Sequence, residues 1–479
     1  MKSHILGQSY VARSINAAND VMMNLFPEAT PLEGKENGFL NRAPGMRKLA
    51  TIGNGPIRAL WTQQTNANNA YVVSGNEVFK IDKGYLPVKL GNIAGSGPVS
   101  IADNGTQLFF AANPEGYIYN ITTNTYTQIT DVDFPGAVTV GYLDGYFVFN
   151  EPDSQKLWVT EIFDGTIIEP LAFASAEGAP DLIAAINVDQ RELWVFGTST
   201  IEVWYNAGTA NFPFARIQGA FNELGCLAPY SVAKLDNTLF WLGNDARGYG
   251  VVYRAEGYRG KRVSTHPIEF AIQSYGDVSN ALAYTYQQEG HAFYVLIFPT
   301  VDKTWVFDVA TGAWHERAGF ENGYFTRHRS NCQMNFQSET IVGDYLNGNL
   351  YVFDLDYYTD NDAVQKWVRS WRALPTGVNN LKRTAQHSLQ LDCESGVGTN
   401  TGQAQDPQVM LRWSDDGGHT WSNEHWVSVG KIGAYYQRAI WRRLGMTVKL
   451  RDRVYEISGT DPNKIVIMGA ELILSGTNA

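Results

Sequence analysis

The chain has 479 residues, of which 44% are hydrophobic, 13% aromatic and 18% charged, with 46 glycines. This composition is enough for a substantial core and is typical of strands joined by tight turns. The net charge of −11 means that the surface as a whole repels nucleic acid. It argues against a conventional DNA-binding protein, though not against a wall past which DNA slides.

The first part of the chain, residues 1–54, lacks a regular hydrophobic period and contains Pro27, Pro31 and Pro44. We expect it to be an extended N-terminal arm that packs on another structure.

A weak repeat follows. Short strand-like segments that pair an aromatic with an aliphatic residue recur every ~40–50 residues. Their aromatic markers are Phe79, Tyr119, Trp158, Trp204, Tyr253, Phe307 and Phe353.

A second feature keeps the same spacing. Turns that contain Asp or Glu, mostly beside Asn or Gly, precede aromatic-rich strands, and such turns are hairpin signals. They lie at residues 103–105, 144–145, 189, 236–237 and 289–290. A four-stranded unit repeated at this spacing predicts a seven-bladed β-propeller over residues 55–380, with a pair of β-sandwiches as the alternative.

The rest of the chain, residues 381–479, predicts a separate β-sandwich-like domain. A polar, glycine-rich loop at 396–407 precedes strand-like runs at 409–413 and 465–468. The segment 362–374 is the best candidate for a helix or a linker. The fold class is therefore all-β: an arm, a propeller and a C-terminal β domain.

Several classes of site are disfavoured. The three cysteines, Cys226, Cys332 and Cys393, are far apart and odd in number, which argues against a disulfide framework and fits assembly in a reducing cytoplasm. There is no CxxC pair and no HExxH, so we expect no metal and no cofactor. Neither a signal-peptide stretch nor a run of about 18 apolar residues is present, so we expect no membrane span.

An Asp-box motif is formed by Ser414, Asp416, Gly418 and Trp421. In this hairpin turn the Ser and Asp side chains bond the backbone, Gly permits a positive φ, and Trp packs beneath. We expect a structural role for it and no catalytic one.

A carbohydrate-binding or glycosidase-type propeller is the alternative function. It requires two carboxylates that flank a bound sugar, together with an exposed aromatic platform. Carboxylates are plentiful, for example Asp236, Asp245, Glu256 and Asp308, but the sequence pairs no two of them.

A run near the C-terminus places six basic residues within 16 positions. They are Arg438, Arg442, Arg443, Lys449, Arg451 and Arg453. In an acidic chain this run predicts either a solvated strand face or an interface with an acidic partner or a phosphate backbone. The arginines Arg438, Arg442, Arg443, Arg451 and Arg453 are the candidate interface.

Motifs in chain order resemble one family, the podovirus packaged-DNA stabilisation proteins, also called tail hub or tail accessory proteins. The motifs are NLFPE at 24–28, ASAEGAPD at 174–181, RELWVFG at 191–197, IEVWY at 201–205, FWLG at 240–243, WHER at 314–317, the 411–421 segment, RRLG at 442–445 and RDR at 451–453. The resemblance spans nearly the whole chain.

The resemblance implies a structural virion protein in the tail, made in the host cytoplasm. It implies a homo-hexameric ring that contacts the portal adaptor ring, the tail needle and the tailspikes. Such a ring closes the channel and stabilises packaged DNA, which passes without sequence-specific binding. It implies no catalysis and no cofactor.

Overall fold

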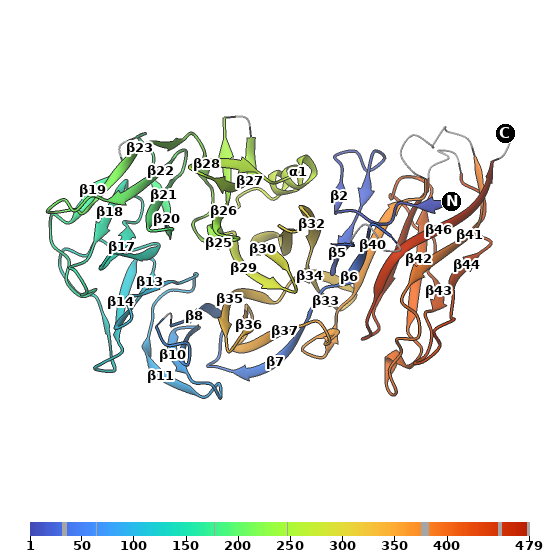
Figure 1. Cartoon of the computed structure of the whole chain (residues 1–479), viewed down its shortest axis with the longest axis horizontal. Helices are drawn as coiled ribbons and strands as arrows, with labels where there is room; N and C mark the ends of the chain where they lie inside the picture. The colour runs from blue at the N-terminus through green and yellow to red at the C-terminus, as the bar shows by residue number, and fades with distance from the viewer. Residues whose placement is uncertain are drawn as a thin grey trace.

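A computed structural model describes residues 1–30, 36–63, 65–176, 178–246, 248–374, 383–448 and 453–476. Regular structure in these ranges is nearly all β-strand, and α1 (His266–Ser274) is their one α-helix. Figure 1 shows two bodies side by side, a ring of strands and, on the right, a pair of packed sheets. The predicted all-β fold, a propeller followed by a sandwich, is confirmed.

The ring consists of consecutive groups of antiparallel strands. The first four groups are β8 (Ile57–Thr62), β9 (Ala70–Ser74), β10 (Glu77–Ile81) and β11 (Pro87–Asn92); β12 (Ser100–Asp103), β13 (Gln107–Ala112), β14 (Glu115–Asn120) and β15 (Thr125–Gln128); β16 (Val140–Leu143), β17 (Tyr146–Asn150), β18 (Lys156–Val159) and β19 (Phe173–Ser175); β20 (Ile183–Asp189), β21 (Glu192–Gly197), β22 (Ile201–Asn206) and β23 (Phe214–Asn222).

Three further groups complete the ring. They are β24 (Gly225–Cys226), β25 (Ala233–Leu235), β26 (Thr238–Asp245), β27 (Gly248–Glu256) and β28 (Arg259–Arg262); β29 (Leu282–Gln288), β30 (His291–Phe298), β31 (Lys303–Asp308) and β32 (Ala313–Glu316); β35 (Ser330–Phe336), β36 (Glu339–Asp344), β37 (Asn349–Asp354) and β7 (Gly45–Thr51). A hairpin of β33 (Ala318–Glu321) and β34 (Tyr324–Arg327) lies between the last two groups in the sequence.

The sequence repeat has a simple structural origin. All seven aromatic markers fall on the strand that is third in the hydrogen-bonded order of its group, which is β10, β14, β18, β22, β27, β31 or β37. The predicted turns join the first and second long strands of a group, and Asp144 (φ +50°) and Gly145 (φ +100°) show the positive φ angles of such a turn.

The hydrophobic core of the ring is divided among its joints. Within the described residues, seven buried clusters each combine side chains from two neighbouring groups, and an eighth large cluster fills the sandwich. At one joint the rings of Phe196 and Trp241 meet edge to face with centroids 5.5 Å apart. Every group is thus held by burial against both of its neighbours.

The N-terminal segment closes this ring. Strand β7 pairs along β37, with Met46 opposite Phe353, and Arg47 forms an ion pair with Asp354, 307 positions away. The last group is therefore built from both ends of the propeller sequence. Because β7 pairs with β37, the edge of β37 is not left open to solvent. Residues 1–54 were expected to be an arm that packs on another structure, but the strands described in this segment pair within their own chain.

The sandwich packs two sheets around one core. One sheet has the order β44-β41-β46-β6-β5, with β1 beside β46, and the other contains β40, β45, β42 and β43. Their bounds are β1 (Lys2–Ser3), β5 (Leu25–Ala29), β6 (Gly38–Arg42), β40 (Trp367–Arg372), β41 (Thr384–Cys393), β42 (Gln408–Ser414), β43 (His425–Ser428), β44 (Ala439–Arg442), β45 (Val454–Gly459) and β46 (Val466–Gly476).

One short strand couples the two bodies. β4 (Met22–Met23) lies parallel to β32 of the propeller and antiparallel to β40 of the sandwich. The result is a continuous nine-stranded sheet that runs from β29 to β43. A second N-terminal hairpin, β2 (Tyr10–Val11) with β3 (Asn19–Asp20), lies beside it.

The prediction of a helix or linker at 362–374 was wrong. The segment contains β39 (Ala363–Val364), which pairs with β38 (Thr359–Asp360), and β40, which lies in the sandwich although the predicted boundary placed it in the propeller. Trp367 and Trp371 are four positions apart, a spacing that puts two side chains on one face of either a helix or a strand. In the structure this segment is a strand because it pairs with β45.

Candidate functional site

The Asp-box turn has the hydrogen bonds expected of the motif. The Ser414 hydroxyl donates to Asp416 Oδ1 (2.6 Å), and the N–H groups of Gly418 and Thr420 donate to Ser414 Oγ (2.8 Å) and Asp416 Oδ1 (2.9 Å). These donors hold the pKa of Asp416 far below its usual value. Its turn packs on the N-terminal hairpin, where Asn19 donates to the Gly417 carbonyl (3.2 Å), so its contacts are structural.

Three candidate interface arginines lie at the sandwich surface. Arg438, Arg442 and Arg443 are exposed on and just beyond β44. Arg438 donates to the Gln390 side chain. Among the described residues, neither Arg442 nor Arg443 has a side-chain partner, so both guanidinium groups are available to a ligand.

Arg442 and Arg443 line a groove of about 660 Å³ beside β41. Its other walls include the exposed apolar side chains of Met446 and Ile473. The groove therefore combines unpaired positive charge with an apolar surface, which suits an acidic protein partner that also has apolar side chains.

Arg453 corrects the prediction of a five-arginine interface. Its side chain is 1% exposed and forms a bidentate ion pair with Asp415, at 2.7 and 2.8 Å. Its Nη1 also donates to the Leu444 carbonyl (2.7 Å). It is buried because it directly precedes β45 (Val454–Gly459), which lies between β40 and β42 in its sheet, and its bond to the Leu444 carbonyl supports the groove from within. Arg451 lies outside the described residues.

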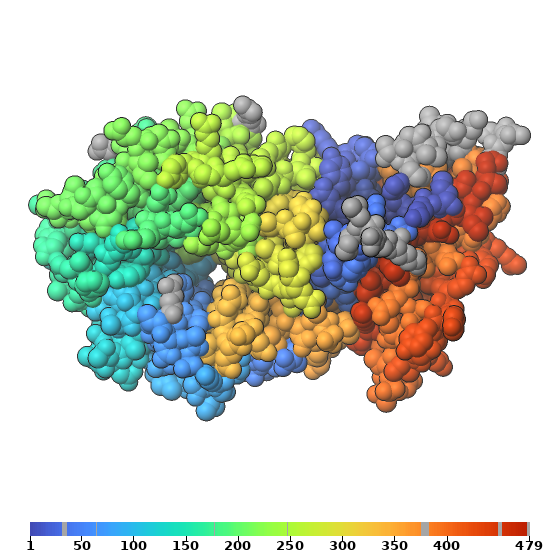
Figure 2. All heavy atoms as spheres, viewed as in Figure 1, coloured from blue at the N-terminus to red at the C-terminus, as the bar shows by residue number. Residues whose placement is uncertain are grey.

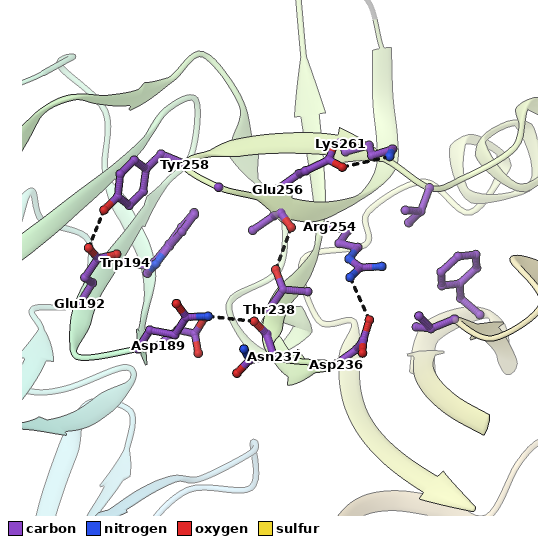
Figure 3. Close-up of a pocket in the computed structure, with 16 residues that line it drawn as sticks. Asp189, Glu192, Trp194, Asp236, Asn237, Thr238, Arg254, Glu256, Tyr258 and Lys261 are labelled. Carbon is purple, nitrogen blue, oxygen red and sulfur yellow. Dashed lines mark hydrogen bonds and ion pairs between the residues drawn. The ribbon is translucent and has the colours of Figure 1, made fainter. Parts of the chain in front are cut away.

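A second pocket, of about 640 Å³, is the place where the described propeller could bind a carbohydrate (Figure 3). It contains four carboxylates on the β20–β21 and β25–β28 side of the propeller. Each has a partner: Asp189 with Lys234 (2.5 Å), Glu192 with the Tyr258 hydroxyl (2.5 Å), Asp236 with Arg254 (2.8 Å) and Glu256 with Lys261 (3.2 Å).

The aromatic side chains of this pocket give little platform. Trp194 is buried, and Tyr258 is the aromatic residue that reaches the surface. Asp308, another carboxylate considered above, is buried elsewhere against His291 (2.9 Å). The described carboxylates of the pocket are thus engaged with neighbours rather than open toward a sugar.

The axis of the propeller holds a space of about 650 Å³, lined by the first strands of the groups. Figure 2 shows a narrow opening near the middle of the ring. Arg58 closes part of it by donating to the carbonyls of Gly97 (2.6 Å), Gly75 (2.9 Å) and Ala94 (3.0 Å). A compact space of this volume, taken as a cube, is about 9 Å across, less than the ~12 Å width of the major groove of a DNA duplex, and is therefore too small for a duplex.

Sequence reasoning missed the buried arginines at the joint of the two bodies. Arg42 donates to the carbonyls of Asp461 (2.7 Å) and Gln365 (2.6 Å), and Arg369 donates to the Ile5 carbonyl (2.6 Å). They satisfy backbone groups that water cannot reach. The available signal was a lone arginine between apolar neighbours, as in the WVRSW sequence of 367–371.

Two classes of site find no support in the described ranges. No group of three or more His, Cys, Asp or Glu side chains there could hold a metal ion, and no helix among those residues is long and apolar enough to cross a membrane. Burial raises the pKa values of the thiols of Cys226, Cys332 and Cys393 to about 12, so these thiols are poor nucleophiles.

Solved structures with similar folds share little sequence. Virginiamycin B lyase from Staphylococcus aureus has 9% identity and a TM-score of 0.43, over 64% of this chain and 98% of its own. YCF48 from Cyanidioschyzon merolae has 11% identity and a TM-score of 0.42, over 65% and 99%. The designed Ika8 protein has 14% identity and a TM-score of 0.39, over 70% and 100%. No curated protein matches the chain.

Two family models match the chain. The first, described as bacteriophage P22 Gp10, β-propeller, covers residues 5–358, and the second, described as bacteriophage P22 Gp10, β-sandwich, covers residues 367–474. The first match covers the propeller and most of the N-terminal strands, of which β5 and β6 lie in the sandwich, and the second covers the C-terminal strands of the sandwich. The chain therefore belongs to the bacteriophage P22 Gp10 family of packaged-DNA stabilisation proteins, which are phage structural proteins.

Proposed function

We propose that this protein is the tail hub of a short-tailed phage. In this role it closes the channel below the portal adaptor, retains packaged DNA in the head, and is a platform for the tail needle and tailspikes. The observation that carries the proposal is the family match over both domains. The proposed role is mechanical and requires neither catalysis nor a cofactor.

The fold suits a part that must resist force. Packaged DNA pushes outward, and each strand group of the ring is buried against two neighbours. Strand β7 pairs with the last group and so closes the ring, and β4 pairs with strands of both the ring and the sandwich. Because the axial space of one propeller is too small for a duplex, we infer that DNA passes between copies, in a ring for which six members are expected. The acidic surface keeps DNA from adhering.

We further propose that the groove with Arg442 and Arg443 docks the adaptor ring. Unpaired guanidinium groups beside apolar side chains suit acidic side chains of a partner. Arg453 is excluded from this surface by its burial.

The test measures genome retention in particles that lack the protein. If the proposal holds, heads fill and then lose their DNA, and added wild-type protein restores retention. An Arg442→Ala, Arg443→Ala double variant should fold normally but bind the adaptor at least tenfold more weakly. An Arg191→Ala, Arg259→Ala variant, which removes two exposed arginines of the propeller, is the matched control.

Other outcomes point elsewhere. Full, stable heads that fail to infect would overturn the sealing role and favour attachment, which is the setting for the carbohydrate alternative. Undiminished adaptor binding by the double variant would reject the groove as the docking site while leaving the sealing role intact.

A further inference from the structure

An exposed apolar surface lies at the edge of the third strand group. We call it the blade-3 patch. Its members are Val132, Ile162, Phe163, Ile167 and Leu171, all exposed, with Phe163 at 63%. Monomeric proteins seldom expose so many large apolar side chains together, and such patches mark interaction sites.

The blade-3 patch is held in a fixed shape. The Glu161 N–H donates to the Ile167 carbonyl (2.9 Å), which closes the loop that carries Ile162 and Phe163. The Gly165 N–H donates to the buried Gln107 side chain (2.7 Å), and the Ile168 N–H donates to Asp131 Oδ2 (3.3 Å), next to Val132. A surface ordered before binding loses little conformational entropy on association.

The loop that carries most of this patch is acidic, and the nearby Arg191 is already paired with Asp144. Residues 157–172 contain Glu161, Asp164 and Glu169 and no lysine or arginine, and Val132 lies between Asp131 and Asp133. A partner for the blade-3 patch should therefore be apolar and basic.

The sandwich carries a surface of that chemistry. We call residues 431–436 the tyrosine loop. Its Ile432, Tyr435 and Tyr436 are exposed, Tyr436 completely. Lys431 begins the loop and the exposed Arg438 follows it, while residues 425–441 contain no acidic residue. Tyrosine and arginine are enriched among the residues that dominate protein interfaces.

The tyrosine loop is also ordered. Ser395 Oγ donates to the Tyr435 carbonyl (2.9 Å), and the Ala434 N–H donates to the Lys431 carbonyl (2.9 Å). The loop precedes β44, whereas Arg442 and Arg443 lie at and beyond the end of that strand. The tyrosine loop is therefore distinct from the arginine groove.

The two surfaces lie at opposite ends of the molecule. In Figure 1, β18 and β19, which flank the 161–171 loop, are at the left, and β43 and β44, which flank the tyrosine loop, are at the right. One copy therefore cannot bring its own two surfaces together.

We propose that the tyrosine loop of one copy docks on the blade-3 patch of a second copy. The contact is head to tail, so each copy keeps one free surface of each kind, and repetition gives a closed ring or an open chain. This inference rests on the proposed function only in taking a ring of copies as the assembly, and it names the two surfaces that build that ring.

Cysteine cross-linking tests the contact directly. Phe163→Cys and Tyr436→Cys are introduced into separate chains, which are mixed and oxidised. The expected product is a disulfide-linked pair that contains one chain of each kind. Leu86→Cys, at a site of 66% exposure, replaces Phe163→Cys in one control, and Tyr324→Cys, at 76%, replaces Tyr436→Cys in the other. A mixed product no more abundant than in the controls would overturn the proposal.

Charge reversal tests the direction of the contact. A blade variant, Glu161→Lys with Glu169→Lys, and a loop variant, Lys431→Glu with Arg438→Glu, should each self-associate at least tenfold more weakly than wild type in sedimentation. When the two are mixed, the unmodified loop of the blade variant can bind the unmodified patch of the loop variant, and the two reversed surfaces are complementary to each other, so assembly with alternating variants should be restored. Unimpaired assembly of each variant alone would contradict the inference, as would a mixture that stays monomeric.

These results are separable from the test of function. If the cross-link fails while heads without the protein still leak, the head-to-tail contact is wrong and the sealing role stands. If the cross-link forms while such heads stay full, the contact stands and the sealing role is wrong.

Discussion

The propeller and the sandwich use their surfaces differently. In the propeller, both faces of each strand group are covered by neighbours, and the carboxylates of its surface pocket are paired with nearby donors. In the sandwich, two arginines have no partner among the described residues, and three large apolar side chains of one loop are exposed. Closure of the ring thus covers the faces of its strand groups and confines exposed apolar side chains to outer loops such as the blade-3 patch, while the sandwich combines exposed apolar side chains with unpaired arginines.

Tryptophan replacement should give the largest contrast between the two regions. Trp241 is fully buried between two strand groups, whereas Trp426 on the sandwich surface is 60% exposed. We expect Trp241→Ala to lower the free energy of unfolding by about 3–5 kcal/mol, because it removes a large side chain and leaves a cavity. Trp426→Ala should change it by less than ~0.5 kcal/mol. Denaturant titration of both variants measures the free energy of unfolding. Equal losses would show that the two regions do not differ in how they use their tryptophans.

Replacement of a buried and of an exposed arginine should affect the stability of the sandwich differently. Arg453→Ala leaves Asp415 without its bidentate partner in a largely buried setting, and we expect a loss of about 3 kcal/mol. Arg442→Ala removes an exposed group and should change stability by less than ~0.5 kcal/mol. The melting temperatures of the two variants check this. A small effect of Arg453→Ala would return that residue to the candidate surface.

Acid should weaken the propeller through its buried histidines. Burial lowers the pKa of His315 to about 3 and that of His328 well below its ordinary value. In the unfolded chain both titrate near ~6.5, so the stability is fully present above that pH and is lost as the pH falls toward 3, because the unfolded state binds the protons. His315 alone should cost about 2 kcal/mol at pH 5.

The matched measurement compares denaturant midpoints at pH 7 and pH 5. His315→Phe places an aromatic ring beside Phe26 and Phe293 and should lose less stability at pH 5 than wild type. His387→Phe, at an exposed position of the sandwich, should behave as wild type does. A wild-type protein equally stable at both pH values would contradict the expectation.

The Asp-box should give the smallest effect. Asp416→Ala removes acceptors for Ser414 and Thr420, for which we expect a loss of about 1 kcal/mol, because the exposed turn groups can bond water instead. Asp416→Asn retains one acceptor and should lose less. The free energy of unfolding measures both, and a loss as large as that of Trp241→Ala would show that the turn supports more than its own hairpin.

Local pattern determined much of the fold. The pattern repeats because each strand group is made of local hairpins and buries its aromatic side chains against its neighbours. Examples are the aromatics Phe79 and Trp204 and the turn at 144–145. The Asp-box could also be recognised directly, since the hydrogen bonds of Ser414 and Asp416 that define its turn reach no further than Thr420. Short-range spacing carries such features.

Long-range strand pairing and the burial of individual side chains became visible only in the three-dimensional structure. That β7 completes the last strand group and β4 joins the two bodies depends on pairing across hundreds of residues, which no local period records. Arg453 and Arg442 look alike in the basic run, yet Arg453 is buried directly before an inner strand, β45, whereas Arg442 is exposed on an edge strand, β44. Strands, turns and the family resemblance could thus be predicted from local pattern, whereas the residues that face water could not, because burial depends on neighbours that are remote in the chain.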